Sequence, residues 1–110
     1  MKTIIVTKEN CEAVAGELVE KLFNKPLRVV SFFRGKGFSG EPKAIPAVLK
    51  LLSGFTFENG RLAIPLKPIR RITWDLNKEK VSITYLDEGL IIIERDLGSE
   101  KKIFRVIVES

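Results

Sequence analysis

The final part of the chain alternates apolar and polar residues with a period of two, the pattern of a β-strand with one buried face. Ile72, Trp74 and Leu76 point one way, with polar residues between them. Similar segments follow at residues 81–85, 90–95 and 101–108. The alternation predicts a four-strand antiparallel meander built from these segments, because antiparallel sheets commonly bury one face and expose the other.

Turn residues mark where these strands reverse direction. Asn59-Gly60 lies between short alternating segments and predicts a type I′ hairpin, since both turn residues need positive φ. In that hairpin Glu58 faces Arg61. Residues 87–89, Asp-Glu-Gly, predict a three-residue turn with glycine in the left-handed position.

The first part of the chain predicts a helix between two strands. Residues 2–6 form a short β-branched run, and Thr7 is placed to cap a helix that ends near Phe23. Apolar residues recur at spacings of three and four along that helix. Asn24 suits the left-handed position after it, and residues 27–33 give a second strand rich in Val and Phe. This order predicts a β-α-β unit with parallel strands and a right-handed crossover.

A short apolar stripe predicts a second helix. Pro42 or Pro46 suits a first helical position, and residues 47–54 supply the stripe and a Ser-Gly end. The complete prediction is an α+β fold: an N-terminal β-α-β unit, a basic glycine loop and a short second helix, then a β-hairpin and a four-strand antiparallel meander. The 110 residues predict a single domain over residues 1–110. We expect Cys11, Phe32 and Trp74 in its core.

Positive charge is concentrated in the middle of the chain. The net charge is +5, but residues 24–71 hold ten Lys or Arg and two Glu, a net charge of +8. Such asymmetry indicates a polyanionic partner. The abundance of Lys, Arg and Glu over Asn, Gln, Cys and Met is typical of proteins from thermophiles.

A glycine loop lies at the centre of that basic segment. Gly35, Gly37 and Gly40 satisfy G-x-G-x-x-G, a pattern that cradles phosphate when it links a strand to a helix. The antiparallel pattern downstream argues against a dinucleotide fold, and Glu41 stands where a P-loop requires lysine. We therefore interpret the loop as an anion-binding element without nucleotide specificity.

Basic side chains with interleaved aromatics are typical of single-strand binding. The sequence favours a small non-enzymatic nucleic-acid-binding protein that contacts phosphates through residues 34–43 and 67–71, with a preference for single strands as one option. The expected nucleic-acid contacts are Arg34, Lys36, Phe38, Lys43, Lys67, Arg70 and Arg71, with backbone anion contacts from Gly35, Gly37 and Gly40.

A second hypothesis is a protein-interaction or assembly module that pairs through an exposed strand edge, with a homodimer as one outcome and the basic segment merely solvated. Under this hypothesis the glycine loop is a connector. Both hypotheses stay open at the level of sequence, as do the choices between DNA and RNA and between single and double strands.

The absence of histidine and the single cysteine restrict enzymatic chemistry. Ser-His-Asp and Cys-His mechanisms and ordinary zinc sites are excluded. We expect no cofactor, no metal and no catalytic residue. A metal-dependent nuclease using Asp75 with Glu94 or Asp96 is the remaining enzymatic alternative.

The sequence predicts a cytoplasmic protein without a membrane partner. It has one cysteine and no secretory signal pattern, and no apolar run comes near the ~20 residues of a membrane span.

The predicted order of strand, helix, strand, basic loop and helix is similar to that of the Alba family of archaeal chromatin proteins. An Arg-Gly loop follows the second strand in that family, and Arg34-Gly35 and Ala44-Ile45 occupy comparable places here. The similarity covers the first half of the chain. The first loop has a single lysine, Lys8, and the later part has too many strands, so we do not assign the chain to that family.

Overall fold

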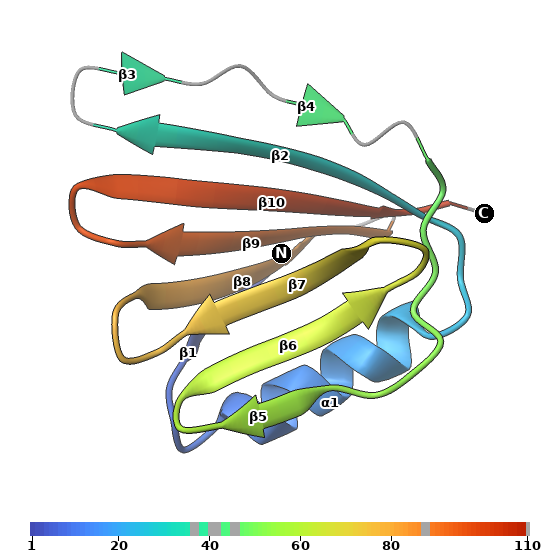
Figure 1. The fold of residues 1–110 in the computed structure, drawn as a ribbon, viewed down its shortest axis with the longest axis horizontal. Helices are drawn as coiled ribbons and strands as arrows, with labels where there is room; N and C mark the ends of the chain where they lie inside the picture. The colour runs from blue at the N-terminus through green and yellow to red at the C-terminus, as the bar shows by residue number, and fades with distance from the viewer. Residues whose placement is uncertain (36–37, 40–42, 45–46, 87–88, 110) are drawn as a thin grey trace.

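The computed structural model describes residues 1–35, 38–39, 43–44, 47–86 and 89–109. These residues form two antiparallel β-sheets and one α-helix (Figure 1). The elements in chain order are β1 (Lys2–Val6), α1 (Cys11–Leu22), β2 (Leu27–Gly35), β3 (Phe38–Ser39), β4 (Lys43–Ala44), β5 (Thr56–Glu58), β6 (Arg61–Leu66), β7 (Arg70–Asp75), β8 (Lys80–Leu86), β9 (Leu90–Asp96) and β10 (Glu100–Val108). The expected α+β class is wrong, because the described chain is mostly β.

The large sheet has the order β1-β8-β9-β10-β2-β3, and β4 also pairs with β2. The predicted β-α-β unit is therefore wrong. β1 and β2 run in the same direction, but β8, β9 and β10 lie between them. The local pattern identified both strands, whereas their partners come from the other end of the chain, with Ile4 opposite Ile83 and Val29 opposite Val106.

The predicted four-strand meander is also wrong. β8, β9 and β10 form a three-strand meander, but β7 leaves it and pairs with β6 in a small sheet of order β5-β6-β7. Leu62 and Ile64 of β6 and Ile72 and Trp74 of β7 are all buried. By joining β6, β7 places its apolar residues on the same buried face as those of the hairpin.

Extended chain replaces the predicted second helix wherever the segment is described. Leu49 and Leu51 are fully buried and alternate with exposed neighbours, which is a period of two. Leu49 forms a bridge with Leu27, and Lys50 forms one with Lys67. Of the four apolar residues of the predicted stripe only Leu51 is buried, whereas Val48 and Leu52 are exposed. Pairing with Leu27 of β2 holds the segment extended. Pro42 and Pro46 lie outside the described residues. Without this helix, the expected similarity to the Alba arrangement does not hold.

Several local predictions are confirmed. Asn59 and Gly60 have φ of 52° and 79°, and Glu58 pairs with Arg61 across the turn. Asn24 has φ of 57° after α1. Gly89 has φ of 78°, while residues 87–88 of the predicted turn lie outside the described residues. The helix begins later than expected: Thr7 and Asn10 exchange side-chain to backbone hydrogen bonds, and Asn10 takes the N-cap position.

A single hydrophobic cluster joins α1 to both sheets. Trp74 and Cys11 are buried in it, as predicted. Phe32 is not in the core. It lies partly exposed on the opposite face of the large sheet, where the Arg105 guanidinium sits 4.9 Å from its ring centroid. The described residues contain no helix long and apolar enough to cross a membrane.

Candidate binding cleft

The face of the large sheet that packs on the core continues into a cleft at the β2–β10–β9 end. Two rows of paired residues form its wall, because residues opposite each other in antiparallel strands project from the same face. Phe33, Lys102 and Arg95 form one row, and Ser31, Phe104 and Ile93 form the next. Strand β7 faces these rows from the small sheet (Figure 1). Phe32 and Ile103, which lie between the two rows in sequence, residues 71–73 of β7 and Lys43 of β4 complete the lining.

The cleft has a volume of about 450 Å³. This lies within the range of roughly 300–1,000 Å³ that is usual for small-ligand sites. Its walls are mainly apolar, with Phe33 39% exposed and Phe104 partly buried against the core. A planar apolar group could therefore insert between the sheets.

Four cationic side chains border the cleft: Lys43, Arg71, Arg95 and Lys102. No acidic side chain belongs to its described lining. Lys43, Arg71 and Lys102 are exposed, and within the described part of the chain none of the three forms an ion pair. The cleft therefore presents three uncompensated positive charges around an apolar interior.

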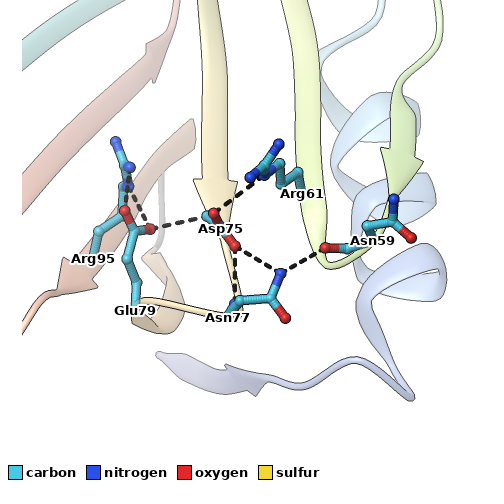
Figure 2. A network of polar contacts seen from close by, with 6 residues as sticks. All are labelled: Asn59, Arg61, Asp75, Asn77, Glu79 and Arg95. Carbon is cyan, nitrogen blue, oxygen red and sulfur yellow. Dashed lines mark hydrogen bonds and ion pairs between the residues drawn. The ribbon is translucent and has the colours of Figure 1, made fainter.

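Arg95 differs from the other three because Glu79 compensates its charge. Its Nε donates to Glu79 Oε2 at 2.9 Å, and its Nη2 donates to Glu79 Oε1. Figure 2 shows this pair at the start of a polar network that links the β7–β8 turn to the β5–β6 turn. Arg95 is the member of this network that also lines the cleft.

Asp75 is the second carboxylate of this network. Its Oδ1 accepts from the Asn77 backbone amide at 2.9 Å and from Asn77 Nδ2 at 3.0 Å, and Arg61 Nε lies 3.3 Å from Oδ2 (Figure 2). The Asn77 backbone hydrogen bond is the largest of the causes that lower the pKa of Asp75. These contacts stabilise the turn. They give the Asp75 carboxylate a structural role, so its position needs no catalytic explanation.

The structure brings together two of the predicted nucleic-acid contacts, Lys43 and Arg71. Arg34 lies opposite Lys101 in the row next to Phe33 and projects from the other face of the sheet. Lys67 and Arg70 do not line the cleft. Lys67 instead pairs through its backbone with Lys50.

The remaining predicted site residues surround the glycine loop. Gly35 is the last residue of β2, opposite Glu100 on one side and Phe38 on the other. Lys36, Gly37 and Gly40 lie outside the described residues. The anion contacts expected from this loop stay a prediction.

Sequence reasoning missed Lys102, Phe104 and Arg95. The first two lie two positions apart on a strand, so they share a face, and this was visible in the sequence. Their placement beside Phe33 depends on the β10–β2 register, which no local pattern specifies.

The described residues hold no group of three or more acidic, Cys or His side chains that could bind a metal ion. Glu94 and Asp96 project from the face opposite Arg95, whereas Asp75 belongs to the small sheet. Cys11 is buried, and burial is the main cause that raises the pKa of its thiol. None of these groups forms an arrangement suited to the nuclease alternative.

No protein-family model matches the chain, and no curated protein matches it. Among solved structures, the crystal structure of Bacillus subtilis YojF protein is similar, with a TM-score of 0.65 and 12% sequence identity. The alignment covers 99% of this chain and 96% of that chain. At this identity the likeness shows a shared fold alone.

Proposed function

We propose that this chain is a non-enzymatic, cytoplasmic protein that binds single-stranded nucleic acid in the cleft between β7 and the large sheet. The observation that supports this most is the combination of three uncompensated cations with two aromatic rings in one cleft. Cations contact the phosphates, while an aromatic surface accepts a base of any sequence.

The size of the cleft favours single strands over duplexes. A volume of about 450 Å³ can hold one nucleotide but not a double helix. In a duplex, moreover, the faces of the bases are stacked on one another and cannot reach Phe33 or Phe104. The proposal therefore places an unstacked base inside and the backbone along Lys43, Arg71 and Lys102.

Binding of labelled oligonucleotides of about ten nucleotides, single- and double-stranded, tests the proposal. Three phosphate contacts on a single strand give a log-log salt slope of about −2. We expect tighter binding of the single strand and an affinity that falls with salt along this slope. Equal or tighter duplex binding, or an affinity that does not change with salt, would contradict the proposal.

A second function is favoured by a separate feature, the open strand edges. β1 ends the large sheet, and its Ile5 is 64% exposed. Open edges pair with other strands unless they are protected. In this alternative, β1 joins a partner strand or a second copy of the chain. A dimer by light scattering, combined with no oligonucleotide binding, would favour assembly over nucleic-acid binding.

A further inference from the structure

The backbone of β7 has an open edge that faces the cleft. The Leu76 amide donates to the Gly60 carbonyl at 2.8 Å, which fixes the alternation of hydrogen bonds between β6 and β7. Ile72 and Trp74 therefore direct their backbone N–H and C=O groups toward β6. The alternate residues Arg71, Thr73 and Asp75 direct their backbone groups away from β6.

The turn closes this edge at Asp75. The Asp75 amide donates to Glu79 Oε2 at 3.2 Å, and its carbonyl accepts from the Lys78 and Glu79 amides at 3.1 and 3.0 Å. No described residue pairs with the corresponding groups of Arg71 and Thr73, both of which line the cleft. The open edge thus consists of two residues, and it lies where the cations and aromatic rings meet.

The groups on this edge are arranged to bind a planar ligand. The carbonyl of one residue and the amide of the residue two positions later lie side by side on the same edge of a strand. The Arg71 carbonyl and the Thr73 amide therefore present an acceptor next to a donor. A nucleobase has the complementary pattern on its Watson–Crick edge, as adenine has with its amino group beside N1.

We infer that the open edge of β7 binds a nucleobase through the Arg71 carbonyl and the Thr73 amide. This inference rests on the proposed function and adds how the base is held. The base lies in the apolar interior formed by Phe33 and Phe104, and its phosphates lie at the cationic rim.

A peptide strand fits this edge less well than a base. Strand addition gains affinity from a run of main-chain hydrogen bonds. Here β7 offers two open residues before Asp75 closes the edge, which suits the short edge of a base.

Proline at position 73 tests the inference, because it removes the Thr73 amide hydrogen. That N–H points away from β6, so the substitution breaks no bond of the sheet, and proline is tolerated at such edge positions. Thr73→Val is the matched control, since it keeps the N–H and loses the hydroxyl. The probes are a labelled single-stranded oligoadenylate and an abasic strand of equal length, at one salt concentration.

We expect wild type and Thr73→Val to bind the oligoadenylate roughly tenfold more tightly than the abasic strand, as a bidentate base contact gives. Thr73→Pro is expected to bind both strands with the abasic affinity. If a folded Thr73→Pro still prefers the oligoadenylate, or wild type does not prefer it, the inference is wrong. In the second case, salt-dependent binding of both strands would leave the proposed function standing.

An experiment on the wild-type protein avoids any loss of folding in the variant. Oligoadenylate in which each base is N6,N6-dimethyladenine lacks the amino hydrogens, so its bases cannot donate a hydrogen bond to the Arg71 carbonyl. Its affinity should fall to that of the abasic strand, and an unchanged affinity would overturn the inference. A third outcome would assign the edge to peptide partners instead. In that outcome the wild-type protein binds an acidic extended peptide but no oligonucleotide, and Thr73→Pro abolishes the binding of the peptide.

Discussion

Arg95 and Glu79 form a two-bond ion pair that joins β9 to the β7–β8 turn (Figure 2). The Glu79 side chain is 4% exposed, while that of Arg95 is 23% exposed. Glu79 also accepts the Asp75 amide, so one carboxylate holds the end of β7 and a strand of the large sheet together. This contact links the end of β7 in the small sheet to β9 in the large sheet, beside the cleft that Arg95 lines.

Replacing Glu79 by alanine should lower the free energy of unfolding by about 3 kcal/mol, because it leaves a largely buried Arg95 and the Asp75 amide without their partner. Urea denaturation measures the change. Glu94→Ala is the control: Glu94 projects from the opposite face and forms no described ion pair, so its loss should fall within about 0.5 kcal/mol. Equal effects of the two substitutions would show that the Glu79 pair does not hold the sheets.

Gly60→Ala should destabilise the β5–β6 hairpin. Gly60 has φ of 79°, and an added Cβ would lie 2.7 Å from Asn77 Nδ2, which donates to the Asn59 carbonyl. We expect a loss of about 2 kcal/mol from the left-handed conformation and the displaced amide. Thermal or urea unfolding measures it. Gly54→Ala provides the comparison, since a Cβ there meets nothing within 4 Å. A Gly60 variant as stable as the Gly54 variant would contradict the turn geometry.

Tyr85 should make the protein less stable at alkaline pH. Burial, with a smaller effect of the Glu17 charge, raises the pKa of Tyr85 from 10 to about 12. The folded state therefore keeps a proton that the unfolded state loses above pH 10. The stability that this proton contributes is complete below pH 10 and is lost as pH rises to about 12.

Tyr85→Phe removes that titration and also a buried hydroxyl that has no hydrogen-bond partner among the described residues. At pH 8 we expect no loss of stability, and a gain of up to about 1 kcal/mol. The variant's advantage over wild type should grow between pH 10 and pH 12, as measured by urea denaturation at each pH. A constant difference across that range would contradict the raised pKa.

The turns and α1 could be predicted from the sequence because the residues that specify them lie close together in the chain. Asn59-Gly60 and Asn24 required positive φ, and the α1 stripe follows a spacing of three and four. The partners of the strands could not be predicted in this way. β7 alternates equally well for pairing with β8 or with β6, so the alternation alone does not choose between them. In the structure β7 pairs with β6, and Trp74 is buried.

The same limit applies to the site. The basic middle segment indicated Lys43 and Arg71, and both line the cleft. Lys102 and Phe104 lie outside that segment in sequence and reach the cleft through the β10–β2 register. The open groups on β7 were equally hidden, since the direction of a backbone amide follows from strand pairing and carries no signature in the side chains.

In the proposed function the cleft, rather than basic charge in general, binds single-stranded nucleic acid. Two triple variants with the same change in charge separate these explanations: Lys43→Gln/Arg71→Gln/Lys102→Gln in the cleft, and Lys78→Gln/Lys80→Gln/Lys101→Gln, which leaves the cleft lining intact. The measurement is the affinity for a labelled single strand over a range of salt. We predict that the cleft variant loses most of the affinity and about 2 units of the log-log salt slope, while the control variant keeps the wild-type slope. Equal losses in the two variants would show that basic charge in general, and not the cleft, binds the strand.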